Sequence, residues 1–98
     1  MTYFPAFFDL TAQRVLVVGG GEVASRKLAL LSRSGAKVTL VAPEIRPEIA
    51  AQAAAGEISV VVREFVPNDL EGARLVIVAT SRRAVNRWIA ALDRKSVV

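Results

Sequence analysis

Short apolar runs alternate with stretches of helical periodicity along most of this chain. The run at residues 14–18 is almost continuously apolar, the pattern of a strand buried on both faces of a parallel sheet. Near the end of the chain, apolar side chains recur at helical spacing and predict an amphipathic helix. Its members are Val85, Trp88, Ile89 and Leu92. Further strands are predicted at 37–41, 58–62 and 75–79, and further helices at 22–34 and 47–55.

Glycine and proline mark the ends of these elements. Gly35 stands where a left-handed residue commonly closes a helix, and Pro47 suits the first turn of the next one. The order β-α-β-α-β-β-α predicts one α/β domain over residues 1–98, with a mostly parallel sheet and right-handed crossovers. Val97-Val98 looks like the stump of a further strand. We therefore expect a doubly wound fold that is incomplete at its C-terminal end.

Composition excludes several kinds of site. The 98 residues include no Cys and no His, which excludes disulfides, thiolate metal ligands and the Ser–His and Cys–His catalytic pairs. The nine acidic residues are scattered, so we expect no metal site. No uncharged run approaches the roughly 20 residues of a membrane helix, and no charged leader precedes a cleavage site. We expect a cytoplasmic protein with no membrane contact.

The net charge of +4 is weak support for an anionic partner. Ten of the 13 basic residues are Arg, which suits bidentate contact with phosphate or carboxylate. Arg82, Arg83 and Arg87 follow the end of a predicted strand, where ligands commonly bind. The dense basic stripe with aromatic residues that is typical of nucleic-acid binding is missing. These arginines form either a ligand contact or an ordinary solvated helix face.

A glycine-rich turn between the first strand and the first helix carries the clearest chemical signal. Gly19, Gly21 and Ala24 match the G-x-G-x-x-A pattern of dinucleotide-binding loops in the strand–turn–helix setting that the motif needs. Gly19 permits a sharp turn, and Gly21 lets the backbone approach a pyrophosphate. Ala24 lets the helix lie close to the sheet. The loop alone does not identify the ligand. A flavin and S-adenosylmethionine are alternatives to a nicotinamide dinucleotide, and a turn that binds no ligand is a third.

Two later strand ends bear on the choice of cofactor. An acidic residue near the end of the second strand would accept a hydrogen bond from the ribose 2′-hydroxyl of NAD. Glu44 fits that role, whereas Arg46 would suit the 2′-phosphate of NADP, so NAD is favoured only modestly. Thr80 and Ser81 end the fourth strand. They are candidates for lining the cofactor crevice, for capping the last helix, or for both.

Four blocks of the sequence resemble the N-terminal domain of siroheme synthase and the related precorrin-2 dehydrogenases. In the order and spacing of that family, they are an aromatic leader at 3–10, the glycine loop at 15–27, the stretch 35–43, and the strand 75–80 with Asn86 after it. The resemblance implies a Rossmann-like fold and an enzyme that uses NAD to oxidise precorrin-2 to sirohydrochlorin. Iron insertion gives siroheme in the same family.

The resemblance also implies site residues and partners. Carried over position by position, the cofactor contacts are Glu22, Val23, Pro43, Glu44 and Thr80, which join Gly19 and Gly21 of the glycine pattern. A tetrapyrrole substrate bearing many carboxylates would give Arg82, Arg83 and Arg87 a role. We expect a homo-oligomer, most simply a dimer.

The chain departs from the family in two respects. Ser81 and Arg82 stand where the family commonly has acidic residues, which could alter contacts near Thr80. The family also continues into a strand with the candidate catalytic Asp and a region for dimerisation and tetrapyrrole binding. We find neither in this sequence, nominate no catalytic residue, and expect the chain alone to be inactive or nearly so. The alternatives are a non-catalytic dinucleotide-sensing module and a structural remnant that binds nothing.

Overall fold

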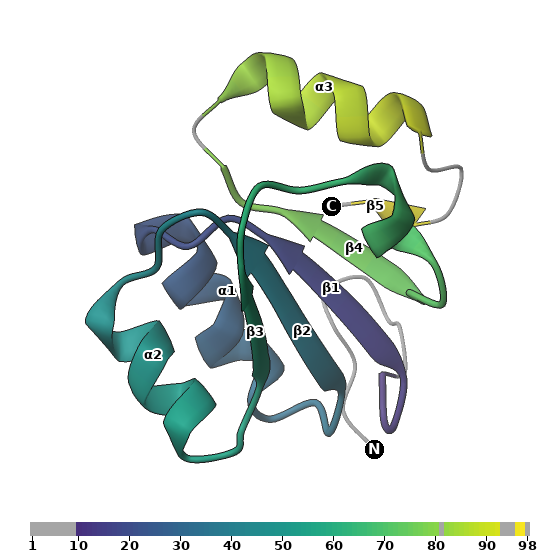
Figure 1. Ribbon diagram of the computed structural model, residues 1–98. Coiled ribbons are helices and arrows are strands. Elements are labelled where there is room, and N and C mark those ends of the chain that lie inside the picture. Colours follow the sequence, from purple (N-terminus) through teal and green to yellow (C-terminus); the bar gives the residue numbers. More distant parts are fainter. Residues whose placement is uncertain (1–9, 81, 93–95, 98) are drawn as a thin grey trace.

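A single parallel sheet organises the computed structural model, which describes residues 10–80, 82–92 and 96–97 (Figure 1). Its order is β3-β2-β1-β4-β5. The strands are β1 (Arg14–Val18), β2 (Lys37–Ala42), β3 (Ser59–Val62), β4 (Leu75–Val78) and β5 (Ser96–Val97). The helices are α1 (Glu22–Leu31), α2 (Pro47–Ala54) and α3 (Arg83–Leu92), with a short 3-10 helix η1 (Pro67–Leu70). The predicted α/β fold is confirmed.

The two faces of the sheet are covered differently. Helices α1 and α2 cover one face, while α3 and the segment 63–74, which links β3 to β4, lie on the other (Figure 1). Alternate residues of β1 therefore enter two separate cores. Val15 and Val17 pack with Leu28 of α1 on the first face, and Leu16 packs with Phe65 on the second. Burial on both faces explains why β1 reads as a continuous apolar run.

The order of the strands creates a switch point in the middle of the sheet. The chain runs outward from β1 through β2 to β3, and then crosses to β4 on the other side of β1. The loops that leave β1 and β4 therefore diverge toward opposite faces. A crevice at the carboxyl ends of the strands is the usual ligand site of such a sheet.

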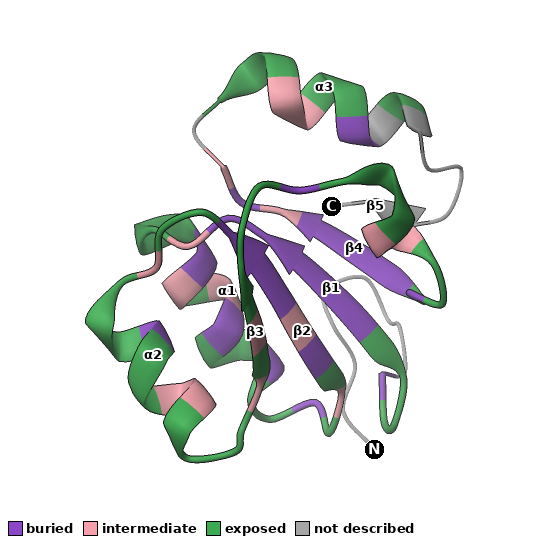
Figure 2. Ribbon diagram, in the orientation of Figure 1, coloured by how far each residue is buried: buried purple, intermediate pink, exposed green. Residues whose placement is uncertain are grey.

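Strand β3 forms one edge of the sheet. It begins one residue later than predicted, and it pairs only with β2 among the described strands. Val61 and Val62 are 36% and 60% exposed, because none of the elements within the described residues covers the end of this strand as α1 and α3 cover β1 and β4. Figure 2 shows the contrast between the exposed β3 and the buried strands β1, β2 and β4.

The expected absence of a C-terminal strand is corrected in part. Ser96 and Val97 form β5, which pairs with β4 in parallel register, Leu75 opposite Ser96 and Val76 opposite Val97. A right-handed crossover through α3 carries the chain to this position. Val98 lies outside the described residues, as does most of the aromatic leader.

The turn after α1 shows how short polar residues end a helix. Helix α1 ends at Leu31, three residues before the predicted end. The buried Ser34 hydroxyl donates to the Leu31 carbonyl over 2.6 Å and accepts from the Ala36 N–H over 3.2 Å. Gly35 has the predicted left-handed conformation, with φ +73°. Within the described ranges, no helix has the length and apolar character needed to cross a membrane.

Candidate functional site

A cleft of about 380 Å³ opens where the loops after β1, β2 and β4 meet. All the positions nominated as cofactor contacts line it. They are Gly19, Gly21, Glu22, Val23, Pro43, Glu44 and Thr80. The parallel register explains this convergence, because the carboxyl ends of β1, β2 and β4 lie side by side. Gly19 and Thr80, which are 61 positions apart in the sequence, thus share one cleft.

The first two glycines of the loop pass very close to the neighbouring backbone. Gly19 has φ +124°, and a Cβ atom there would lie 2.6 Å from the carbonyl oxygen of Ala79. A Cβ atom on Gly20 would overlap the carbonyl oxygen of Glu44. Hydrogen bonds hold this arrangement, from the Gly19 N–H to the Val41 carbonyl over 3.0 Å and from the Arg46 N–H to the Gly20 carbonyl over 2.9 Å. No side chain fits at either glycine without moving the loops.

Gly20 was not nominated from the sequence, although it is the most tightly enclosed of the three glycines. The G-x-G-x-x-A pattern treats its position as variable. The sequence did contain a sign that Gly20 is needed. The motif requires two glycines, so the third in the run has to be explained by something else, here the close packing.

Gly21 has a different role. A Cβ atom there would meet no atom within 4 Å, and its φ of −96° suits any residue. Gly21 is the N-cap of α1 and no side chain caps this helix end. The first N–H groups of α1, at Glu22 and Val23, thus stand at the cleft with the partial positive charge of a helix N-terminus. This arrangement suits a phosphate group.

The loop after β2 places Glu44, and not Arg46, in the cleft. Pro43 and Glu44 line it, whereas the Arg46 side chain turns to Glu48, with Nε 3.2 Å from Oε2. The two roles that the sequence left open are therefore separated in space. Glu44 belongs to the cleft lining, and the Arg46 guanidinium is paired with Glu48 outside it.

Thr80 both lines the cleft and ties down the start of α3. Its hydroxyl donates to Asn86 Oδ1 and accepts from the Arg82 N–H over 3.2 Å, while Asn86 Nδ2 donates to the Thr80 carbonyl over 3.1 Å. Thr80 thus holds the start of α3 from two residues before the N-cap position, which is Arg82, and it is not itself the N-cap. Ser81 lies outside the described residues. The role of Asn86 was not foreseen, because it depends on how α3 approaches the loop.

The wall opposite the glycine loop was largely missed from the sequence. It includes Glu64, Phe65, Arg82 and Val85. Of these, only Arg82 was singled out, and its Nη1 lies 3.8 Å from the Glu64 carboxylate. Arg83 and Arg87 are exposed and do not line the cleft. The segment 63–74 has no regular periodicity, so its place beside the cleft had no sequence signal.

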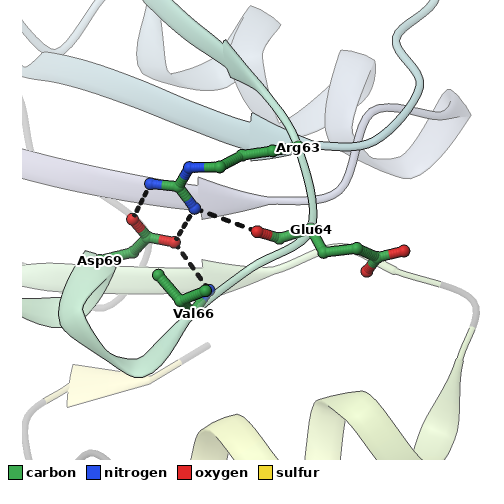
Figure 3. Close-up of polar contacts among 4 residues, drawn as sticks. All are labelled: Arg63, Glu64, Val66 and Asp69. Atoms are coloured by element: carbon green, nitrogen blue, oxygen red, sulfur yellow. Dashed lines mark hydrogen bonds and ion pairs between the residues drawn. The ribbon is translucent and has the colours of Figure 1, made fainter.

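A bidentate ion pair holds that segment. Arg63 Nη1 and Nη2 donate to Asp69 Oδ2 and Oδ1 over 2.9 and 2.6 Å, and the Val66 N–H donates to Oδ2 over 2.9 Å (Figure 3). The hydrogen bonds from Arg63 are the main reason that the pKa of Asp69 is lowered. The same contact raises the pKa of Arg63. In the part of the chain that the structure describes, no group of three or more acidic residues could hold a metal ion.

Comparison with known proteins assigns the domain. A family described as "Putative NAD(P)-binding" matches residues 6–98, nearly the whole chain. The chain belongs to this family. Curated relatives of this NAD(P)-binding domain include siroheme synthase 3 of Aeromonas hydrophila, 52% identical over 89 residues, and the siroheme synthase of Chromobacterium violaceum, 47% identical over 91. The alignments cover 91% and 93% of the chain, and the chain spans about a fifth (19%) of each relative's length.

A solved structure supports the same assignment. The structure titled "SirC, precorrin-2 dehydrogenase" superimposes with a TM-score of 0.87 at 33% sequence identity, over 96% of this chain and 47% of that one. The Rossmann-like fold and the resemblance to siroheme synthases and precorrin-2 dehydrogenases are confirmed. Sequence identity and superposition thus agree on this NAD(P)-binding domain.

The three glycines differ in a way that unfolding experiments can measure. We expect Gly20→Ala to lower the free energy of unfolding by about 2 kcal/mol or more, because the new methyl overlaps the Glu44 backbone. Gly21→Ala adds its methyl in open space and costs under about 1 kcal/mol, the penalty of Ala at an N-cap. Urea unfolding followed by circular dichroism measures both. Equal losses would contradict the assigned geometry.

The Asp69 ion pair predicts a specific acid sensitivity. Because the pKa of Asp69 is lowered in the folded state, its ionised form stabilises the protein above the unfolded pKa of about 3.9. That contribution disappears as the pH falls below about 4. Urea unfolding between pH 6 and pH 3, values chosen around that pKa, should show a steeper loss for the unchanged chain than for Asp69→Asn. Parallel curves would refute the prediction.

Proposed function

We propose that the cleft binds NAD and that the domain serves an enzyme that oxidises precorrin-2 to sirohydrochlorin in siroheme formation. The observation that carries the proposal is the convergence of all nominated cofactor positions on one cleft at the switch point of the sheet. The similarity to siroheme synthases and to SirC supports the choice of pathway. Bound NAD would supply the hydride acceptor.

The residues present fit a dinucleotide. A pyrophosphate needs close approach to the backbone, and Gly21 leaves open space directly in front of the uncapped N-terminus of α1. Thr80 and Ala79 line the cleft beside the glycine loop. The task of these residues is to bind and orient the cofactor. The chain's own residues suggest no catalytic group.

Charge in the cleft favours NAD over NADP. Three carboxylates line it, at Glu22, Glu44 and Glu64, against one guanidinium, at Arg82. The 2′-phosphate of NADP would add about two negative charges beside Glu44, and Arg46 is already paired with Glu48. A 2′-hydroxyl instead donates to a carboxylate.

The proposal also covers the substrate, the cellular compartment and the oligomeric state. Arg83 and Arg87 are exposed on α3 next to the cleft-lining Arg82 and suit a substrate rich in carboxylates. A tetrapyrrole such as precorrin-2 has that chemistry. The use of NAD fits a cytoplasmic enzyme, and we include a homo-oligomeric state in the proposal.

Titration calorimetry with NAD tests the proposal. We expect saturable binding to the folded chain, and at least about tenfold weaker binding by Gly21→Asp, whose carboxylate would stand against the pyrophosphate. Asp is a favoured N-cap residue, so this variant should keep its fold. Gly21→Asn has nearly the same shape without the charge and should lose less affinity. Absence of binding by the folded, unchanged chain would refute the proposal and favour the structural remnant.

Glu44 should determine the preference between the two cofactors. Glu44→Gln keeps the size of the side chain but removes its charge, so the ratio of the Kd for NADP to that for NAD should fall about tenfold. Glu57→Gln, before β3 at the opposite end of the sheet, is the matched control and should leave the ratio unchanged. A ratio that Glu44→Gln does not alter would contradict the role of Glu44.

A further inference from the structure

One wall of the cleft is built by a segment without regular secondary structure. Residues 63–74 link β3 to β4, and η1 is their only helical turn. Glu64 and Phe65 of this segment line the cleft. A wall on a loop needs fixed contacts to present a defined surface to a ligand.

Asp69 supplies those contacts on both sides of Glu64 and Phe65. On one side it binds the Arg63 guanidinium through both oxygens, and on the other it accepts the Val66 N–H. Arg63 Nη1 also donates to the Glu64 carbonyl over 3.0 Å. Figure 3 shows the Glu64 carboxylate directed away from this cluster. The backbone from 63 to 66 is thus held by one carboxylate that lies outside the cleft.

The constraint extends through Phe65 to α3. Phe65 is 7% exposed and packs on the second face of the sheet with Leu16 and Val41. Its ring meets Trp88 edge to face, with the centroids 5.4 Å apart and the planes at 84°. Val85, one turn before Ile89 on the same helix, lines the cleft. The position of Phe65 therefore also affects the part of the wall that α3 contributes.

We propose that Asp69 is a positioning residue for dinucleotide binding, which acts by holding Glu64 and Phe65 in the cleft wall. This inference rests on the proposed function. Asp69 itself does not line the cleft. The Arg63 side chain is 45% exposed and the Asp69 side chain 10%. Partial exposure limits the contribution of the pair to stability, whereas a bidentate pair with an additional backbone bond determines geometry. Besides its contribution to stability, Asp69 is therefore expected to affect affinity for the ligand.

The first experiment compares Asp69→Asn with Glu71→Gln by NAD titration. Both substitutions remove one negative charge from the same segment, but Asp69, and not Glu71, is the residue that bonds Arg63 and the Val66 N–H. We expect the Kd for NAD to rise about tenfold in Asp69→Asn and less than about twofold in Glu71→Gln. Trp88 is the only tryptophan, so its emission independently reports a displaced Phe65 in Asp69→Asn.

A second, milder variant tests the same contact in case Asp69→Asn does not fold. Arg63→Lys keeps the positive charge but not the bidentate geometry, and it should raise the Kd by about threefold. Circular dichroism establishes that each variant is folded at the titration temperature. An unchanged Kd in folded Asp69→Asn or Arg63→Lys would overturn the positioning role.

A coupling experiment separates positioning from general stability. On a Phe65→Leu background, Asp69→Asn should raise the Kd by a smaller factor than in the unchanged chain, because one of the two side chains that it positions has been replaced. An equal effect in both backgrounds would indicate a purely structural role and overturn the inference. If the unchanged chain does not bind NAD, the proposed function fails and the positioning role fails with it. If it binds and Asp69→Asn binds equally well, only the positioning role fails.

Discussion

Backbone crowding at the carboxyl ends of three parallel strands is the constraint on which the rest of this structure depends. Gly19 passes the Ala79 carbonyl, and Gly20 passes the Glu44 carbonyl, at distances that exclude a Cβ atom. Because Gly19 and Gly20 have no side chains, the loops after β1, β2 and β4 can meet. Hydrogen bonds from the Gly19 and Arg46 N–H groups join the first two loops, and at the end of β4 the Ala79 N–H donates to the Val18 carbonyl. The cleft is the space left beyond this contact, with Gly21 and the first turn of α1 at its edge.

The two faces of the sheet serve different purposes. Helices α1 and α2 cover the first face and add Leu28, Leu31 and Ile49 to a core that comes mostly from the strands. The second face is covered by a loop and by α3, which meet through Phe65 and Trp88. The first face therefore holds the glycine loop in place by regular packing. The second face shapes the cleft wall through a few specific contacts.

Electrostatics inside the cleft run against the overall charge of the chain. The net charge is +4, yet the cleft is lined by three carboxylates and one guanidinium. In the proposed function, attraction for a phosphate would come mainly from backbone N–H groups at the start of α1. Acidic residues around that point would oppose additional negative charge on a ligand and so favour the less charged of two similar anions.

The sequence alone determined the elements and their order, since hydrophobic period, glycine and proline act over a few residues. It also located the cleft residues of the glycine loop and the ends of β2 and β4, because parallel strands bring their carboxyl ends together. The exact end of α1 and the short β5 needed the structure.

Only the tertiary structure decided the opposite wall and the division of roles within the loops. Phe65 meets Trp88 of a distant segment, and the Arg63–Asp69 pair spans six residues of a stretch with no regular periodicity, so no sequence pattern relates either pair. The steric need for Gly20 depends on where the loop after β2 lies. Helix, strand and turn preferences depend on neighbouring residues. Close approaches between backbone segments, and the contacts of their side chains, depend on where those segments lie after folding.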